Sequence, residues 1–285
     1  MERRAKRTGF RPDIEGLRAV AVIAVVLYHA GIPGVTGGYI GVDIFFVISG
    51  FLITGLLFRE VTTANTVRLG PFYGARARRL LPAAATVGII TAIGAAVVLP
   101  ALQARSVFLD GIASALYVGN YRFAMQGTDY LGSNMPSPFQ HYWSLGVEEQ
   151  FYLVWPVLII GTAWLVRRIS PLRGTAARAT PYAVVLGLVG AASLAAAVLW
   201  TRTSPPWAFF SLPTRTWELA AGGLLALSIQ HWRHLSLLTA SIAGWGGLAL
   251  ILLTCTQLDA RTPYPGTAAL MPVLGTALII GGGSV

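Results

Sequence analysis

The 285-residue chain is 55% hydrophobic and 11% charged, with a mean hydropathy of +0.65. Soluble domains carry about 25% charged residues, so this composition excludes a disordered chain, a coiled coil and nearly every soluble enzyme. It predicts a polytopic membrane protein. The net charge of +10 comes from short basic clusters between apolar runs, which are typical of topology signals and of contacts to an anionic substrate. A nucleic-acid binder would need one continuous basic face instead. The single cysteine, Cys255, excludes an internal disulfide and a cysteine-based metal site, and we expect no bound metal.

Most of the apolar segments have the ~20 residues that a helix needs to cross ~30 Å of hydrocarbon. In chain order they are 14–32, 39–58, 80–99, 107–118, 143–166, 182–200, 209–229, 235–254 and 267–280. We therefore predict an all-α fold, a polytopic transmembrane helix bundle, formed by one domain over residues 1–285. No internal repeat is visible.

Basic residues indicate how the bundle is oriented. They concentrate in residues 1–11, 59–79 and 167–180, so we expect these segments to be cytoplasmic. An even number of crossings must separate two cytoplasmic loops, yet three apolar segments lie between the second and third clusters. The segment 107–118 is short and contains Asp110, and we interpret it as re-entrant or interfacial. The pattern then predicts eight crossings, with both chain ends on the cytoplasmic side of the membrane.

Ionisable residues inside such segments are candidates for function, because burying them in lipid costs free energy. The first segment contains Arg18 and His29, which are eleven residues apart. Eleven residues make almost three helical turns, so both lie on one face, ~16 Å apart along the axis. Histidine titrates near neutral pH and can act as a base, an acid or a nucleophile. The alternative is a histidine that only joins helices by a hydrogen bond.

The second segment opens with Asp43, which enters the membrane from the same predicted outer side as His29. We expect its carboxylate to bind one imidazole nitrogen of His29 and fix the tautomer. A carboxylate favoured by the helix dipole is the alternative. The pair Ser49-Gly50 is typical of close helix packing, and we do not predict Ser49 to be a nucleophile.

Two further groups complete the candidates. Arg76 and Arg79 are three residues apart, so they share a helix face at the predicted cytoplasmic mouth, where guanidinium forks bind phosphates. An orienting charge cluster that binds nothing is equally compatible with this spacing. Glu148 and Glu149 lie within a hydrophobic segment, and adjacent helical residues point about 100° apart, so at most one of them faces a given site.

Two residues of these segments have simpler interpretations. Arg215 and Glu218 are three residues apart, so we predict that they form an internal ion pair. Trp143 fits an interfacial aromatic belt.

Several long motifs in the same order resemble the acyltransferase-3 family of bacterial membrane acyltransferases. They run Phe10 to Arg18 with His29, Gly41 to Phe51, Phe72-Tyr73 with Arg76 and Arg79, Trp143 to Tyr152, and Arg215 to Leu219. Ala75 stands where many relatives have a further arginine. The stretch from Asp129 to Ser144 is similar to the subgroup that often carries a fused C-terminal SGNH domain. Family members usually have ten or more spans, and the chain ends at Val285 without a polar tail, so we expect a longer protein.

The resemblance implies a multi-pass enzyme of the bacterial cytoplasmic membrane. It would transfer an acyl group, typically acetyl, from cytoplasmic acyl-coenzyme A to a hydroxyl of an extracytoplasmic glycan or glycolipid. His29 would be the catalytic residue, with Asp43, Glu148 and Glu149 nearby, and Arg18, Arg76 and Arg79 would bind the donor. Acetyl-CoA would be a substrate rather than a permanently bound cofactor. Direct attack by the acceptor and an acyl-histidine intermediate both remain open, and the group that stabilises the oxyanion is unassigned.

Two other functions are compatible with the same residues. A proton-coupled transporter would use His29 and the carboxylates as a proton relay, although the paired repeats common in transporters are missing. A non-catalytic scaffold would use the charges only to hold helices together. In that case replacing His29 would harm stability as much as activity.

Overall fold

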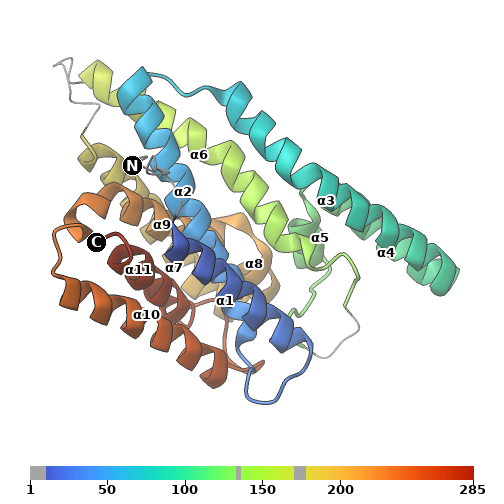
Figure 1. The fold of residues 1–285 in the computed structure, drawn as a ribbon. Coiled ribbons are helices and arrows are strands. Elements are labelled where there is room, and N and C mark those ends of the chain that lie inside the picture. Colours follow the sequence, from blue (N-terminus) through green and yellow to red (C-terminus); the bar gives the residue numbers. More distant parts are fainter. Residues whose placement is uncertain (1–10, 133–135, 170–177) are drawn as a thin grey trace, which may run out of the picture.

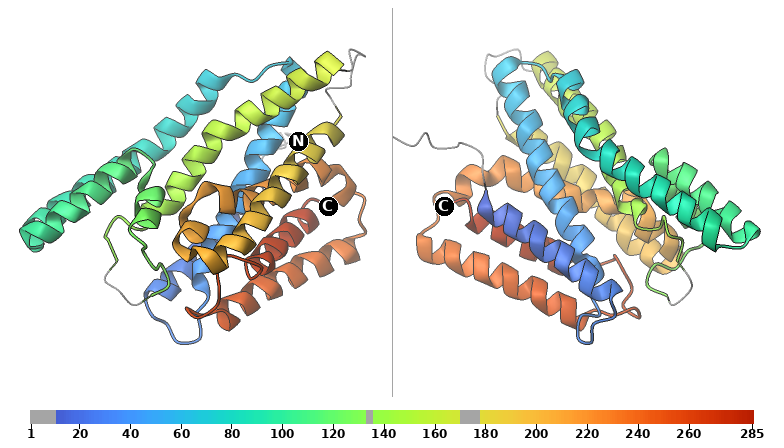
Figure 2. Two further views of the ribbon diagram at one scale, coloured as in Figure 1. Left: turned by 180° about the vertical axis from the view of Figure 1, so that it is seen from behind. Right: turned by 45° about the vertical axis from the view of Figure 1, so that its right-hand side comes forward.

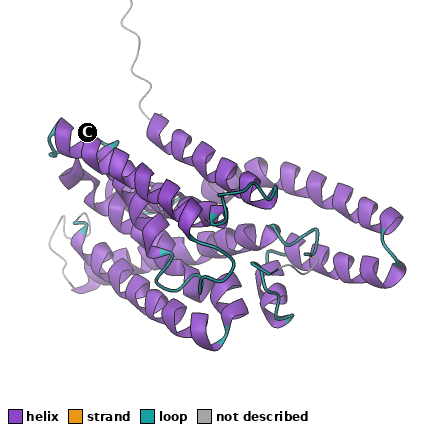
Figure 3. Ribbon diagram, turned by 90° about the horizontal axis from the view of Figure 1, so that it is seen from below, coloured by secondary structure: helices purple, strands orange, loops and turns teal. Residues whose placement is uncertain are grey.

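The computed structural model describes residues 11–132, 136–169 and 178–285. Within these residues the protein is helical and contains no β-strand, as the sequence predicts (Figure 3). The elements in chain order are α1 (Pro12–His29), the 3₁₀ turn η1 (Gly38–Ile40), α2 (Gly41–Ala64), α3 (Leu69–Val98), α4 (Ala101–Ala115), α5 (Gly119–Met125), α6 (Tyr142–Ile169), α7 (Thr180–Thr203), α8 (Pro205–Phe210), α9 (Leu212–Trp232), α10 (Leu237–Gln257) and α11 (Leu270–Gly282).

Five helices of the described chain are long and apolar enough to cross a membrane: η1 with α2, and α3, α6, α7 and α10. The remaining predicted crossings fall on α1, α9 and α11. Helices α1 and α9 carry charged residues, and α11 has only 13 residues. A polytopic helical bundle is therefore confirmed, whereas the number of eight crossings and the direction of insertion stay predictions. Residues 1–10 of the N-terminal basic cluster lie outside the described residues, as does Arg173 of the third cluster.

The segment 59–79 is helical over most of its length, which corrects the loop expected there. Helix α2 continues to Ala64 and α3 begins at Leu69, so Arg76 and Arg79 lie on the first turns of a 30-residue helix. Arginine is a good helix former, and its long stem can carry the charge away from an apolar helix surface. A run of arginines therefore does not end a helix.

The segment expected to be re-entrant or interfacial folds as α4, which has 15 residues and starts at Ala101 rather than at 107. It packs along α3, and the pair projects beyond the rest of the bundle (Figures 1 and 2). Asp110 is buried and accepts a hydrogen bond of 2.6 Å from Arg122 of α5, so the polar residues of this segment form an internal ion pair. How deep α4 lies in a membrane stays a prediction.

Helix α9 is the centre of the bundle, with α2 packed along one side and α7 along another. The approach of α2 to α9 depends on glycine. A Cβ atom at Gly50 would overlap the main-chain oxygen of Leu219, and one at Gly222 would overlap that of Val47. Small residues that let two backbones meet are a common means of helix association in membranes. Gly50 thus has the packing role that the sequence indicated.

The segment between α1 and α2 is tied to the far end of α10. The amide of Gly37 donates to the Cys255 carbonyl at 2.8 Å, and the Thr36 hydroxyl donates to the Leu258 carbonyl at 2.6 Å. These bonds fix the end of α1, where His29 lies, against the loop that follows α10.

Candidate active site

The arginines predicted for the donor side meet at one cavity of about 330 Å³ between α1, α2, α3 and α6. We call it the arginine cavity. Its polar lining comprises Arg18, Ser49, Arg76, Arg79, Glu148 and Tyr152. The cavity is therefore lined by three guanidinium groups and one carboxyl group, that of Glu148. Such a cavity suits a ligand with several negative charges, because each guanidinium can bind a phosphate through two parallel hydrogen bonds.

Arg76 is held between two aromatic rings. Its guanidinium carbon lies 3.8 Å from the ring centre of Phe72 and 4.3 Å from that of Tyr152, and Nη1 donates to the Phe72 carbonyl at 3.3 Å. Tyr152 belongs to α6, and its main-chain oxygen accepts from the Tyr73 hydroxyl of α3 at 3.1 Å. The two helices thus fix the plane of the guanidinium before any ligand arrives.

Arg18 and Arg79 are less constrained. Arg18 donates to Glu15 one turn earlier on α1 at 2.6 Å, and Arg79 is exposed. An exposed ion pair of this kind contributes about 0–1 kcal/mol, so a phosphate can compete for Arg18 at small cost.

Glu148 occupies the inner wall of the arginine cavity. The Ser49 hydroxyl of α2 donates to Glu148 Oε1 at 2.6 Å, and the Tyr152 hydroxyl donates to Oε2 at 3.5 Å. Ser49 is thereby engaged as a partner of Glu148. Glu149 does not line the cavity, as expected for the neighbour of a residue that does.

His29 lies at the other end of α1 and is exposed. Its Nδ1 is 2.8 Å from the main-chain oxygen of Val25, one turn earlier, and its Nε2 is 3.5 Å from the Tyr130 hydroxyl. A carbonyl oxygen only accepts hydrogen bonds, so Nδ1 carries a proton, and in the neutral form of the ring the lone pair is on Nε2. Burial raises the pKa of Tyr130 to about 12, so its hydroxyl stays protonated at neutral pH and can donate to Nε2.

The predicted site residues form two groups, as expected, but Glu148 lies with the donor-side arginines and not near His29, which corrects its predicted place. Arg18, Arg76, Arg79 and Glu148 meet at the arginine cavity, and His29 stands apart from them. Because Arg18 and His29 share α1, their separation along the helix is ~16 Å. A reaction that uses both groups needs a ligand long enough to reach from one to the other.

Asp43 has a different partner from the one that we expected. It is fully buried and accepts a hydrogen bond of 3.1 Å from Arg215, whereas the nitrogens of His29 contact Val25 and Tyr130. The main-chain oxygen of Val25 thus does the orienting expected of Asp43. Sequence reasoning missed this pairing because Asp43 and Arg215 come from α2 and α9, far apart in the chain. In the sequence, the one feature that Asp43 and Arg215 share is that each is a charged residue within an apolar helix.

Arg215 also confirms the ion pair predicted within α9. Its Nη1 donates to Glu218 at 2.7 Å, and both side chains are almost fully buried. The rings of Phe46, Trp143, Phe209 and Tyr264 surround the guanidinium at 5.2–5.8 Å. Trp143, expected in an interfacial belt, is 1% exposed and belongs to this cage. Its indole makes edge-on contacts with the rings of Phe46 and Phe210 and lies beside the guanidinium, so it is buried by packing and not held at the interface.

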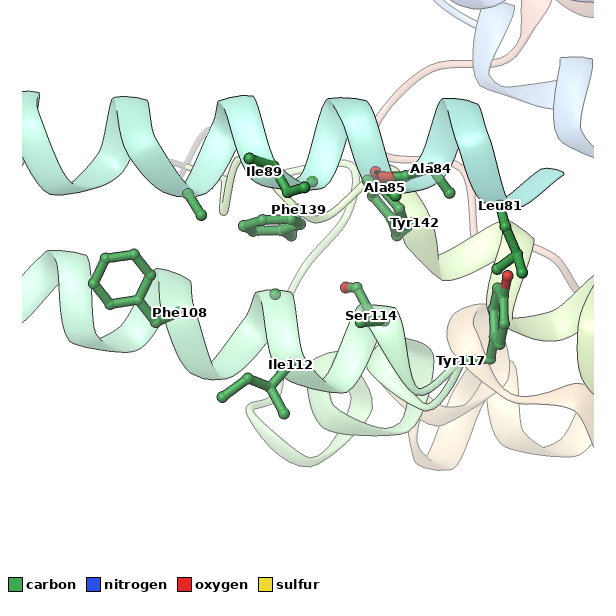
Figure 4. Close-up of a pocket in the computed structure, with 14 residues that line it drawn as sticks. Leu81, Ala84, Ala85, Ile89, Phe108, Ile112, Ser114, Tyr117, Phe139 and Tyr142 are labelled. Atoms are coloured by element: carbon green, nitrogen blue, oxygen red, sulfur yellow. Dashed lines mark hydrogen bonds between the residues drawn. The ribbon is translucent and has the colours of Figure 1, made fainter.

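A cavity larger than the arginine cavity lies elsewhere, between α3 and α4, and measures about 600 Å³ (Figure 4). Its walls are mainly apolar, and Phe139 points into the space between the two helices, as Figure 4 shows. None of the predicted site residues lines it. A cavity of this composition on a projecting pair of apolar helices suits hydrocarbon rather than acyl-transfer chemistry.

Comparison with known proteins is consistent with these motifs. The "Peptidoglycan O-acetyltransferase OatA" of Listeria monocytogenes is 36% identical over 218 residues, which cover 75% of this chain and 33% of that protein. The "Putative peptidoglycan O-acetyltransferase YrhL" of Bacillus subtilis is 35% identical over 218 residues, covering 76% and 33% of the two chains. The chain thus spans about a third of the length of the curated relatives that it matches. No solved structure matches it. The model of the acyltransferase domain matches residues 11–284, and the chain belongs to the acyltransferase-3 family.

Proposed function

We propose that this protein is an integral-membrane O-acyltransferase. It moves an acyl group, with acetyl as the expected one, from cytoplasmic acyl-coenzyme A to a hydroxyl of an extracytoplasmic glycan or glycolipid. The observation that carries the proposal is the placement of the arginine cavity and His29 at opposite ends of α1. The names of the two relatives favour peptidoglycan as the acceptor.

The donor fits the arginine cavity for a chemical reason. Coenzyme A carries its phosphates at one end and its thioester at the end of a long flexible arm. Arg18, Arg76 and Arg79 would bind the phosphates, and the arm would run along α1 towards His29. Glu148, held by Ser49 and Tyr152, would position α2 against α6 at the cavity wall.

His29 can act in two ways, and both remain open. In the first, Nε2 takes the proton of the acceptor hydroxyl while its oxygen attacks the thioester carbonyl, and the thiolate of coenzyme A leaves. In the second, Nε2 attacks the thioester carbonyl and coenzyme A leaves as its thiolate. The acceptor oxygen then attacks the acyl-imidazolium, its proton passes to the thiolate or to water, and Nε2 regains its lone pair. Both need a lone pair on Nε2, and the bond from Nδ1 to Val25 selects the neutral tautomer that has one there. Asp43 and Glu149 would act on this chemistry only through the positions of the helices that carry them.

The test is transfer of label from radiolabelled acetyl-CoA in membranes that contain the full protein. Wild type is compared at matched expression with His29→Ala and with His234→Ala, an exposed histidine after α9. We expect label in glycan or lipid for wild type and His234→Ala, and a loss of about 10²-fold or more for His29→Ala.

Other outcomes would contradict the proposal. Equal transfer by His29→Ala would remove His29 as the catalytic residue. Proton-coupled flux without any transfer of label would favour the transporter. Loss of folded protein in step with activity in His29→Ala would favour the scaffold, and thermal unfolding of the purified variants in detergent measures that loss.

A further inference from the structure

A second polar cavity lies at the His29 end of the bundle. It measures about 400 Å³, and residues 128–131, the α7–α8 junction and residues 260–264 form its walls. We propose that this cavity is a subsite for a sugar ring of the acceptor glycan, next to the ring whose hydroxyl is acylated. The proposal rests on the proposed function and adds to it a place where the acceptor binds.

The cavity is connected to His29 through Tyr130. The Tyr130 ring lines the cavity, while its hydroxyl lies 3.5 Å from His29 Nε2. The ring is stacked on Phe209, with 4.5 Å between the ring centres and 22° between the planes. A sugar in the cavity would therefore lie one aromatic ring away from the imidazole. That separation suits a neighbouring unit of a polymer rather than the reacting unit itself.

The lining has the composition expected for a neutral polyol. Tyr130, Phe209 and Tyr264 offer aromatic surface for the C–H faces of a sugar ring. Thr128, Asp129 and Arg261 add a hydroxyl, a carboxylate and a guanidinium, which can bind sugar hydroxyl and amide groups. Ligand sites usually combine such walls with a few polar groups, in volumes of about 300–1,000 Å³.

The charges of its lining distinguish this cavity from the two cavities described above. The arginine cavity has three cations and suits phosphates, and the cavity between α3 and α4 is apolar and suits hydrocarbon. One acidic and one basic side chain line the cavity beside His29, so its charges balance. A neutral, hydroxyl-rich ligand matches it better than an anionic donor or a lipid tail does.

Both polar segments of the wall are preformed. Asp129 Oδ1 accepts from the Leu131 amide at 3.1 Å, which shapes the first segment. Asp259 Oδ1 accepts from the amides of Arg261 and Thr262 and from the Thr262 hydroxyl, each at 3.0 Å. The Thr262 hydroxyl and these amides lower the pKa of Asp259, so its turn stays intact at neutral pH. A preformed site loses less conformational entropy when a ligand binds.

The experiment compares Asp129→Asn and Arg261→Gln with wild type in the full protein, purified in detergent. The matched control is Arg202→Gln, because Arg202 is exposed near the same cavity without lining it. The probe is a β-1,4-linked tetramer of N-acetylglucosamine. One measurement is the rate of acetyl transfer to the tetramer as its concentration varies. The other is binding of the tetramer by saturation-transfer-difference NMR without acetyl-CoA.

We expect Asp129→Asn and Arg261→Gln each to raise the KM for the tetramer about ten- to a hundredfold, the effect of losing one hydrogen bond to a charged group. The KM for acetyl-CoA should stay unchanged, and Arg202→Gln should match wild type. The NMR signal should fall in the same two variants.

The outcomes separate the subsite from the proposed function. Transfer to the tetramer with the same KM in all variants would overturn the subsite and leave the function standing. If the tetramer binds to wild type, binds more weakly to Asp129→Asn and Arg261→Gln, and receives no acetyl group from any of them, the subsite is supported and the proposed function is contradicted. Neither binding nor transfer in wild type would overturn both.

Discussion

Asp43 of α2 and Arg215 of α9 form an ion pair of 3.1 Å in which the two side chains are 0% and 1% exposed. Glu218 shares the same guanidinium nitrogen, so one buried cation serves two carboxyl groups. Removing the guanidinium should therefore lower the free energy of unfolding far more than removing one of the two carboxyl groups. The triad holds α2 against α9, the contact around which the bundle is built.

This asymmetry gives a prediction for stability. Arg215→Met should lower the free energy of unfolding by about 3–5 kcal/mol, because it leaves Asp43 and Glu218 buried without a cation. Asp43→Asn should cost about 1 kcal/mol, since the pair of Arg215 with Glu218 survives. Thermal unfolding in detergent, followed by circular dichroism, measures both. Equal losses would contradict the shared-cation arrangement, and partial recovery in the double variant would support it.

Gly50 provides a second prediction about the same helix pair. Gly50→Ala would place a methyl group on the main-chain oxygen of Leu219, so we expect a loss of about 1–3 kcal/mol. Gly55→Ala, one turn further along α2, is the matched control, because its new Cβ atom would sit 3.8 Å from Ala226. Thermal unfolding should separate the two variants. Similar melting temperatures would mean that α2 and α9 can move apart at little cost.

Arg76 should contribute to donor binding through its shape as well as its charge. Arg76→Lys keeps the charge but loses the planar group held between Phe72 and Tyr152. We expect the KM for acetyl-CoA to rise about tenfold, the effect of ~1.4 kcal/mol, with a smaller change in kcat. Arg78→Lys serves as the control, because Arg78 is exposed on the same helix and does not line the arginine cavity. If both variants behave alike, only charge near the cavity matters.

Tyr130 is predicted to position His29. Tyr130→Phe keeps the stack on Phe209 but removes the hydroxyl that faces Nε2, so we expect transfer to fall about three- to tenfold. Because the pKa of Tyr130 is raised to about 12, the hydroxyl does not ionise near neutral pH. The pH profiles of variant and wild type should thus have the same shape around neutral pH and differ by a constant factor.

Tyr121→Phe is the control for Tyr130→Phe, since Tyr121 packs against Trp207 away from His29. A profile that gains or loses a titrating limb in Tyr130→Phe would mean that the Tyr130 proton takes part in the reaction itself.

Ser49 offers a test of how Glu148 is held. Ser49→Ala removes the 2.6 Å hydrogen bond to Glu148 without adding bulk, so we expect a loss of about 1–3 kcal/mol in stability and a higher KM for acetyl-CoA. Ser228→Ala, whose hydroxyl bonds only within α9, should change neither. A complete loss of transfer by Ser49→Ala with normal stability would instead point to Ser49 as a nucleophile.

The class of the protein and its helical frame follow from the order of the residues, because apolar runs of membrane length can satisfy their backbone hydrogen bonds only as helices. Local spacing also determined the relations within single helices: the pair of Arg215 with Glu218, the shared face of Arg76 and Arg79, and the divergence of Glu148 from Glu149. In each case the residues lie within one helical turn, where the backbone alone fixes geometry.

Which charges meet across helices depends on how the helices pack, and no local spacing reveals it. The partner of Asp43 depends on how α2 and α9 pack, which the glycines of both helices control and no local pattern records. The same holds for Tyr130, which a segment between helices brings against His29, and for Trp143, which packing places in the cage around Arg215. A buried charge needs a partner that offsets the free-energy cost of its desolvation. The sequence shows that such a partner is required, and the packing of the helices decides which residue it is.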